Sequence, residues 1–303
     1  MFWEWYFESG NHNVALAGLV NEGARAGRFN ISITQFLSTQ VWQPSESEQQ
    51  RIAECLSSAD EAIAAQARKV DALKKHKKGL MQQLFPREGE TQPRLRFPEF
   101  REAGEWESTP LARLLERSPD YGVSLSAVPF SKELPTYLRI TDISDDGLYL
   151  KEKRVSVDFE AKSESYLKLG DIVLARTGAS VGKSYRYREE DGALVFAGFL
   201  IRIRPDQETL LPDFLSGYLA SDTYWDWVAI NSARSGQPGI NSAEYSSLLI
   251  PLPPKISEQQ CIASCLGRLD TLITIEAQKL EVLNCHKRGL MQQLFPSPVG
   301  VEE

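Results

Sequence analysis

Residues 177–184 read TGASVGKS and end in Gly-Lys-Ser, as loops that bind nucleotide phosphates do. Such a loop needs a glycine separated by four residues from its Gly-Lys, because the backbone must turn there to direct its N–H groups at phosphate. That position is Thr177. The loop must also open a helix, whereas the next residues, SYRYREEDGALVF, predict a strand and a turn. The sequence therefore argues against a nucleotide-dependent enzyme that uses this segment.

The same segment belongs to the one clearly basic stretch of the chain. Arginine and lysine there can hold phosphates or read guanine edges, and serine and threonine can bond to either. The spacing alone fits an ordinary loop and a charged, solvent-facing strand equally well. Together with two residues of an earlier predicted strand, the candidate DNA-binding residues are Arg176, Thr177, Ser180, Lys183, Ser184, Arg186, Arg188, Tyr137 and Arg139.

A second candidate segment, residues 231–241, reads NSARSGQPGIN. Its Gly and Pro predict a loop. The side chains of Ser232, Arg234 and Gln237 can donate hydrogen bonds toward phosphate or bases, although a turn without function is the alternative.

Catalytic groupings are missing from the sequence. The three histidines, His12, His76 and His286, do not combine with other residues into a Ser/His/Asp set, a paired-carboxylate pattern or a metal-ligand spacing. The four cysteines lack the spacing of a metal site and predict small free thiols. We therefore predict no catalytic residue, no metal and no cofactor.

Two long helices are predicted from a duplication. Residues 47–86 align without a gap with residues 257–296 and share 23 identities in 40 positions, including GLMQQLFP at the end of each copy. Apolar residues recur in both copies at three- and four-residue steps up to Pro86 or Pro296. A helix of this length, roughly 55 Å, with one narrow apolar stripe needs a partner helix, and the other copy is the obvious one. The lysines of 74–78 and the pair 287–288 more simply form a solvated charged face than a site.

One mixed domain is predicted between the helices. Residues 87–105 are rich in Pro, Gly and charge and predict an extended connector. We expect a short amphipathic helix at 106–117, helices at 212–230 and an apolar segment at 248–254. Short runs typical of strands lie at 136–143, 148–157, 166–175, 183–188 and 193–204. The predicted class is α+β, a largely antiparallel sheet with helices plus two paired long helices.

Composition and charge limit the possible functions. The formal net charge of −7 counts against a nucleic-acid binder, which usually carries a basic surface. No apolar run is long enough to cross a bilayer, and the opening MFWEWYFESG lacks the basic lead of a signal peptide, so we expect a cytoplasmic protein without membrane contact.

Five motifs lie along the chain: EQQ-I-A at 48–53 and 258–263, GLMQQLFP at the end of each long helix, RLRFPEF at 94–100 with EWE at 105–107, LKLGDIVLARTGASVGK at 167–183, and IPLPP at 250–254. Together they resemble the specificity (S) subunit of type I restriction-modification enzymes. The GLMQQLFP ending paired with RLRFPEF is the specific part of the resemblance, and the GDIVLARTG segment is weaker by itself.

The resemblance implies a non-catalytic subunit of an adenine methyltransferase and endonuclease complex. In that family two target-recognition domains, each followed by one long helix, read the two halves of a split DNA sequence, and the helices pair antiparallel as a spacer. Two methyltransferase (M) subunits, which use S-adenosylmethionine, bind to it, and a restriction translocase (R) subunit can join. Double-stranded DNA and the M and R subunits are thus the implied partners.

The chain departs from the family pattern at its first domain. RLRFPEF introduces a single domain here, and the match of residues 24–32 with 233–242 suggests that only the end of another precedes it. We expect residues 1–43 to be the remnant of a first recognition domain, 44–86 a first spacer helix, 87–254 a complete recognition domain and 255–303 a second spacer helix. A homodimer through the long helices would restore two half-sites. A helical adaptor that binds M subunits without reading DNA is the alternative.

Overall fold

The computed structural model describes residues 1–17, 21–22, 29–41, 43–233 and 237–295. The chain divides into two compact units. Unit 1 comprises Met1–Lys74 and Thr271–Glu303, and unit 2 comprises Lys75–Asp270. Each unit therefore contains a part of both long helices.

The predicted long helices are α4 (Glu46–Leu84) and α8 (Ile256–Leu294), of 39 residues each. Helix α4 ends shortly before Pro86, because proline has no N–H to continue the helical hydrogen bonds. Glu46 and Glu48 place negative charge in the first turn of α4, where the helix dipole favours it. Among the helices of the described residues, none combines the length and the low polarity needed to cross a membrane.

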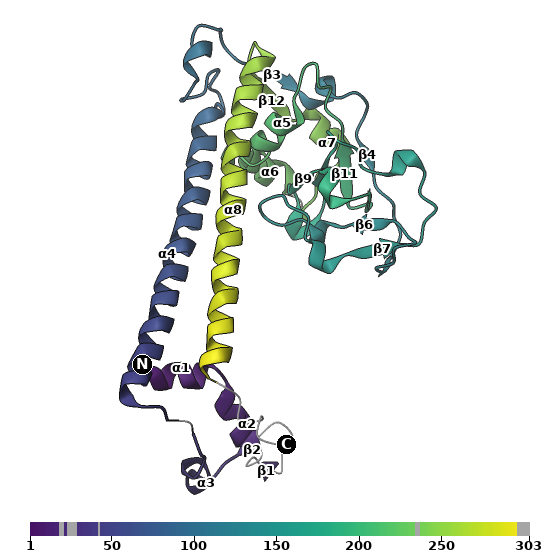
Figure 1. Cartoon of the computed structure of the whole chain (residues 1–303). Helices are drawn as coiled ribbons and strands as arrows, with labels where there is room; N and C mark the ends of the chain where they lie inside the picture. The colour runs from purple at the N-terminus through teal and green to yellow at the C-terminus, as the bar shows by residue number, and fades with distance from the viewer. Residues whose placement is uncertain (18–20, 23–28, 42, 234–236, 296–303) are drawn as a thin grey trace. The chain divides into compact units, whose positions relative to one another are not determined.

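The two helices pair antiparallel through equivalent residues (Figure 1). In unit 2, the Lys77 ammonium lies 2.6 Å from the Asp270 carboxylate. In unit 1, their counterparts Lys287 and Asp60, shifted by 210 residues, lie 2.8 Å apart. The same contact is thus made once in each unit, which confirms the predicted pairing.

Unit 2 holds two four-stranded sheets and a two-stranded one, with the strand orders β10-β6-β7-β5, β4-β11-β8-β9 and β12-β3. The pair β6–β10 is parallel, and the other pairs in these sheets are antiparallel. The predicted α+β class with a largely antiparallel sheet is therefore confirmed. The strands are β3 (Glu107–Pro110), β4 (Asp120–Tyr121), β5 (Ala127–Pro129), β6 (Thr136–Leu138), β7 (Val155–Val157), β8 (Ile172–Ala175), β9 (Ser184–Arg186), β10 (Leu194–Phe196), β11 (Leu200–Ile203) and β12 (Leu249–Leu252).

The structure corrects the helix predicted at 106–117. This segment forms β3 and a 3-10 turn, Leu111–Leu114. Pro110 disfavours helical backbone at Thr109, and β3 pairs with β12 instead. The predicted strands are present but shorter, because 3-10 turns interrupt several of them. The helical region at 212–230 splits into α5 (Pro212–Tyr218) and α6 (Asp222–Ser232), where Ser221 caps the start of α6; α7 (Ser242–Ser247) follows.

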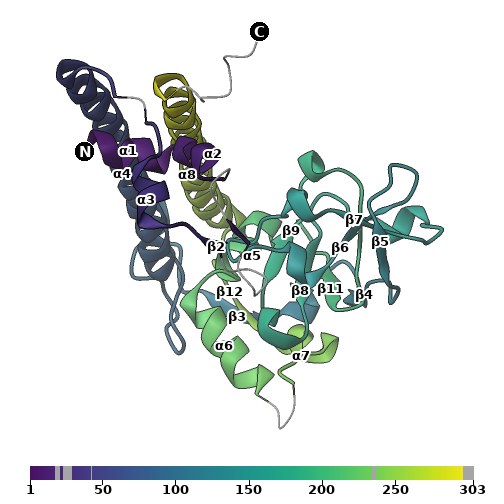
Figure 2. The ribbon, with the colours of Figure 1, turned by 90° about the horizontal axis from the view of Figure 1, so that it is seen from below.

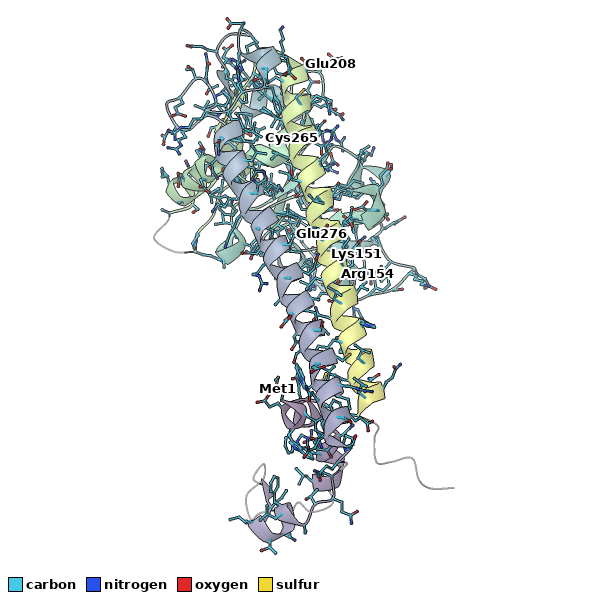
Figure 3. The ribbon with its side chains drawn as sticks, turned by 60° about the vertical axis from the view of Figure 1, so that its left-hand side comes forward. Met1, Lys151, Arg154, Glu208, Cys265 and Glu276 are labelled. Atoms are coloured by element: carbon cyan, nitrogen blue, oxygen red, sulfur yellow. The ribbon has the colours of Figure 1, made fainter. Side chains whose placement is uncertain are left out.

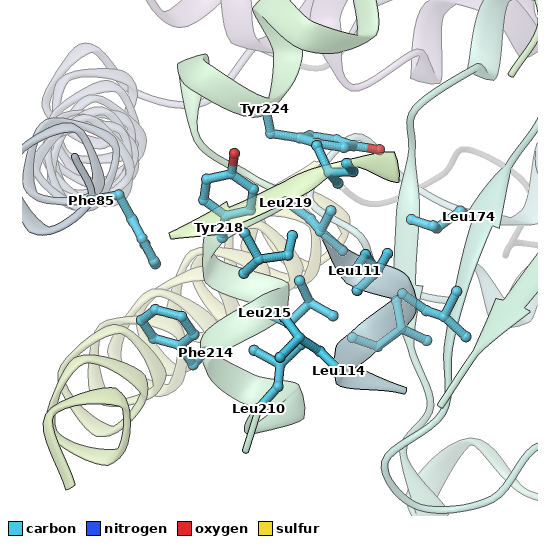
Figure 4. Close-up of a cluster of buried hydrophobic side chains, with 14 of the residues drawn as sticks. Phe85, Leu111, Leu114, Leu174, Leu210, Phe214, Leu215, Tyr218, Leu219 and Tyr224 are labelled. Carbon is cyan, nitrogen blue, oxygen red and sulfur yellow. The ribbon is translucent and has the colours of Figure 1, made fainter. Parts of the chain in front are cut away.

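The main core of unit 2 joins the end of α4 to the sheet domain (Figure 4). Phe85 lies against Phe214 and Tyr218 of α5, with ring centroids 5.2 and 5.8 Å apart. Gly217 of α5 leaves room for Phe85 and for Leu266 of α8, because an added Cβ there would lie 3.3 Å from the Phe85 ring and 2.9 Å from the Leu266 side chain. The helices are thereby fixed to the domain at their ends.

Unit 1 repeats this arrangement with different elements. Its described part contains the helices α1 (Phe2–Glu8), α2 (Asn11–Ala17) and α3 (Ile33–Leu37), and the strands β1 (Asn21–Glu22) and β2 (Phe29–Asn30), which pair antiparallel. Phe295, the counterpart of Phe85, lies against Phe2 and Tyr6, with centroids 5.6 and 6.1 Å apart. Ser32 caps α3 in a capping box with Gln35, as Asn241 caps α7 with Glu244.

Candidate nucleic-acid interface

The segment that resembles a phosphate-binding loop has a different structure. After β8 the chain makes a 3-10 turn, Gly178–Ser180, and continues into strand β9. Gly178 and Gly182 take positive φ values of 71° and 86°, which glycine adopts without strain. No helix begins at this turn, so its N–H groups do not form the phosphate site of a nucleotide-binding loop.

The two candidate segments, distant in sequence, meet at one place. Thr177 and Gly239 form an antiparallel bridge, and Gly178 N–H donates to the Pro238 carbonyl over 3.0 Å. Ile240 N–H donates to the Arg176 carbonyl over 2.9 Å. A Cβ on Gly178 would lie 3.2 Å from the Gln237 amide nitrogen, so glycine keeps room for this side chain. We call residues 176–178 with 237–240 the loop pair.

Arg176 stands out among the candidate cations. Its guanidinium carbon lies 4.9 Å from the ring centroid of Tyr121, a cation–π arrangement. The Tyr121 hydroxyl donates to Ser242 Oγ over 3.0 Å and accepts from Ser242 N–H over 3.1 Å. The hydrogen bonds with the side chain and backbone of Ser242, together with the nearby charge of Arg176, lower the pKa of Tyr121. Arg176 makes no salt bridge with any residue that the structure describes.

The other basic candidates are paired with acids. Lys183 lies 2.6 Å from Asp145 and lowers the pKa of that carboxyl. Arg186 lies 2.8 Å from Asp213 of α5, and Arg188 lies 3.7 Å from Glu190. Ser184 and Ser180 are half-buried, on β9 and in the 3-10 turn. The predicted basic stretch therefore does not present one continuous positive face.

Three candidates have structural roles instead. Tyr137 is only 3% exposed, and its hydroxyl donates to the carbonyls of Val123 and Leu125. Arg139 donates twice to the fully buried carboxylate of Asp142, which raises the pKa of Arg139. Ser232 is buried at the end of α6. Tyr137, Arg139 and Ser232 therefore have structural roles, and their contact with DNA stays a prediction.

The remaining candidate of the second segment, Arg234, lies outside the described residues. The described residues contain no group of three or more His, Cys, Asp and Glu side chains placed to hold a metal ion. The four cysteines are free thiols.

Exposed aromatic residues were missed by sequence reasoning. Tyr121 is 43% exposed and Phe199 is 59% exposed. Residues 193–204 were predicted as one strand, which places Phe199 on the same side as the buried Ile201. The chain instead turns at 197–199, between β10 and β11, and this leaves Phe199 outside. The guanidinium carbon of a second arginine, Arg154, which Figure 3 labels, lies 4.9 Å from the ring centroid of Phe130.

Known proteins are similar to this chain along most of its length. The family model "Type I restriction modification DNA specificity domain" matches residues 126–284. Two relatives come from Methanocaldococcus jannaschii: the type I restriction enzyme MjaVIII specificity subunit, 24% identical over 88% of this chain, and the putative type I restriction enzyme MjaX specificity subunit, 25% identical over 90%. This chain spans 64% and 62% of the length of these relatives.

Solved structures share the fold. A chain from a study of complex assembly and conformational transition in a type I R-M system has a TM-score of 0.59 at 16% identity, with 94% of this chain and 67% of that chain covered. The S subunit of the type I restriction-modification system of M. genitalium has a TM-score of 0.57 at 16% identity, with 97% and 72% covered. Since the family model covers more than half of the chain, including β8, β9 and the loop pair, this protein belongs to the type I restriction-modification DNA specificity domain family.

Proposed function

We propose that the chain is a non-catalytic DNA-recognition subunit that reads one half of a split target through the domain at 87–254. The observation that carries this proposal is Arg176, a partly exposed guanidinium without an acidic partner among the described residues, at the loop pair of the family-matched region. An unpaired arginine beside small polar side chains such as Thr177 and Gln237 is suited to phosphates and guanine edges.

The long helices would serve as the scaffold for methyltransferase subunits. The helix segments 44–86 and 255–303 pair through the repeated Lys–Asp contacts, which suits a spacer of fixed length. We propose that adenine-methylating M subunits bind this scaffold, that a restriction translocase joins the complex, and that the chain adds no cofactor of its own. A homodimer through the helices would supply the second half-site.

Residues 1–43 would be the end of another recognition domain. Phe2 and Tyr6 hold Phe295 as Phe214 and Tyr218 hold Phe85, with the same spacing of four residues. The capped helix α3 would correspond to α7. These contacts support the interpretation that the two aromatic pairs descend from one duplicated element.

Salt-dependent DNA binding tests the proposed reading of DNA. The full chain with its M subunits should bind duplexes in a sequence-dependent way. Arg176→Ala should weaken duplex binding by about tenfold or more, because a contact to a guanine edge or a phosphate is lost, and loss of a phosphate contact would also reduce the slope of log affinity against log salt by about 1. Arg186→Ala is the matched control and should leave the slope unchanged, since Asp213 already neutralises Arg186. A complex that binds M subunits but shows no sequence preference would contradict the proposal.

A second candidate function, an assembly adaptor that does not read DNA, is favoured by the net charge of −7 and by the paired state of Lys183, Arg186 and Arg188. It predicts that the chain binds M subunits and that Arg176→Ala has no effect on duplex binding. Mapping methylated sites in cells with and without the chain separates the two functions.

A further inference from the structure

Three exposed or partly exposed side chains share one end of the β4-β11-β8 sheet. Alternation along β8 takes Arg176 to the side of Leu174, and Leu174 faces Ile201 across the ladder in the main core. Tyr121 is the Cα partner of Ile201 on the other side of β11. The Arg176 N–H donates to the Phe199 carbonyl over 3.1 Å, so Phe199 stands opposite Arg176 beyond the last strand pair. We call Tyr121, Arg176 and Phe199 the Arg176 surface; Figure 2 shows its strands side by side.

The Arg176 surface is fixed before any ligand binds. The Tyr121 ring lies under the guanidinium, and the two bonds to Ser242 at the start of α7 hold the Tyr121 hydroxyl. A guanidinium that lies on an aromatic ring keeps its planar fork of donors in one orientation, so little side-chain entropy remains to be lost on binding. Phe199, whose carbonyl accepts the Arg176 N–H, adds an apolar side chain that is 59% exposed at the same end of the sheet.

We propose that the Arg176 surface is the base-reading element of this domain: Arg176 donates to a guanine edge in the major groove, and Phe199 contacts the C5-methyl of a neighbouring thymine. A forked donor matches the O6 and N7 acceptors of guanine, and an apolar side chain matches the thymine methyl. Tyr121 is a positioning residue, because it orients Arg176 without touching the base. No acidic partner among the described residues competes with guanine for Arg176.

The inference rests on the proposed function, and its test uses a randomised pool of duplexes bound by the full chain with its M subunits. The selected half-site should contain a guanine and a neighbouring thymine. Replacing that thymine by deoxyuridine removes only the methyl group and should weaken wild-type binding about fourfold. Phe199→Ala should weaken binding to the thymine duplex by the same factor and should be insensitive to the replacement.

Separate variants test the role of Arg176 and the role of Tyr121. Arg176→Lys should relax the preference for guanine about tenfold, because an ammonium cannot pair with both acceptors. Tyr121→Leu should relax it in part, and Tyr121→Phe should restore it, because the ring alone supports the guanidinium. Leu169→Ala is the matched control: Leu169 is 61% exposed but precedes β8, at the end opposite Arg176, and its loss should leave the selected sequence unchanged.

The outcomes distinguish the two proposals. If the wild-type complex selects no sequence, both fail. If it selects a sequence that contains no such guanine and thymine, or that Phe199→Ala and Arg176→Lys leave unchanged, the Arg176 surface is not the reading element and the proposed function stands.

Discussion

The two repeated helices, α4 and α8, have the same contacts at their C-terminal ends but different contacts at their N-terminal ends. At the ends, Phe85 and Phe295 are both buried, each against a phenylalanine and a tyrosine four residues apart on a short helix. The aromatic side chain just before the final proline therefore fastens each long helix to the small helices of its own unit. Its environment is the same although the surrounding elements differ.

At the helix starts, equivalent glutamates have different environments. Glu258 is 1% exposed and accepts two hydrogen bonds from Arg96, each of 2.8 Å. Its counterpart Glu48 is exposed and makes no salt bridge with a described residue. Gln259 likewise bonds to the backbone of Leu211 and Thr209, whereas Gln49 bonds to the carbonyl of Pro44, five residues earlier in the chain. Among the described residues, the SEQQ sequence thus anchors a domain in unit 2, where the RLRFPEF connector supplies Arg96.

The largest effect on stability is expected at the C-terminal ends of the helices, where the two copies make the same contacts. Phe85→Ala and Phe295→Ala should each destabilise their own unit by about 4 kcal/mol, because a buried aromatic side chain is replaced by a cavity. Urea unfolding would give the loss, and hydrogen exchange resolved by peptide would locate it, in unit 2 for Phe85 and in unit 1 for Phe295.

Val282→Ala is the control for these two variants, since Val282 is exposed on α8. Its effect should stay within about 0.5 kcal/mol. Equal exchange in all peptides of the Phe295→Ala and wild-type proteins would show that the two helix ends are not equivalent anchors.

The next largest effect on stability is expected at the N-terminal ends of the helices, where the contacts of the two copies differ. Arg96→Ala should cost about 3 kcal/mol, because it leaves the Glu258 carboxylate buried without its partner. Glu48→Ala, at the position equivalent to Glu258, should change stability by less than about 0.5 kcal/mol. Thermal unfolding of both variants measures the contrast, and a double variant, Arg96→Met with Glu258→Leu, should recover much of the loss. A similar cost for Arg96→Ala and Glu48→Ala would remove the proposed difference between the helix starts.

Sequence reasoning found the long helices because their signals are local and repeated. Apolar spacing, early acids and Pro86 define α4 without knowledge of anything it packs against. The interface could be predicted only in part. Arg176 and Gln237 were identified in two separate segments, but their meeting depends on the bridge between Thr177 and Gly239, a contact across 62 residues of sequence.

The features of the site that the sequence could not predict have a common physical cause. Whether an arginine is free or neutralised depends on tertiary partners, such as Asp142 for Arg139 and Asp213 for Arg186. Whether a tyrosine is a surface or a core residue depends on which face of its strand is covered, and this separates Tyr121 from Tyr137. Residue type and spacing specify neither property.

A smaller effect is expected at the repeated Lys–Asp contact. Asp270→Asn should weaken the helix pair by about 0.5 kcal/mol, since the ion pair is partly exposed. Asp60→Asn should cost less, because Lys287 keeps a second carboxylate, Glu8, at 3.3 Å and lies over the Trp5 ring. The difference should shrink in 1 M salt, where such pairs are screened. Unfolding curves at low and high salt would measure it, and a larger loss for Asp60→Asn would contradict this ranking.

The smallest effect concerns Glu276, labelled in Figure 3, which accepts a hydrogen bond from Gln66, its own counterpart in the other helix. The hydrogen bond from Gln66, with further bonds from Lys279 and Lys69, lowers the pKa of Glu276 from 4.5 to about 2. Because the folded pKa lies below the unfolded one, the stabilisation is complete above pH 4.5 and is lost as the pH falls toward 2. Glu276→Gln should therefore be less stable than wild type at pH 6, and the gap should narrow by pH 3, as urea unfolding at both pH values would measure. Glu61→Gln, an exposed change on α4, should show no such narrowing. A gap that stays constant between pH 6 and pH 3 would mean that the carboxylate of Glu276 does not stabilise the paired helices.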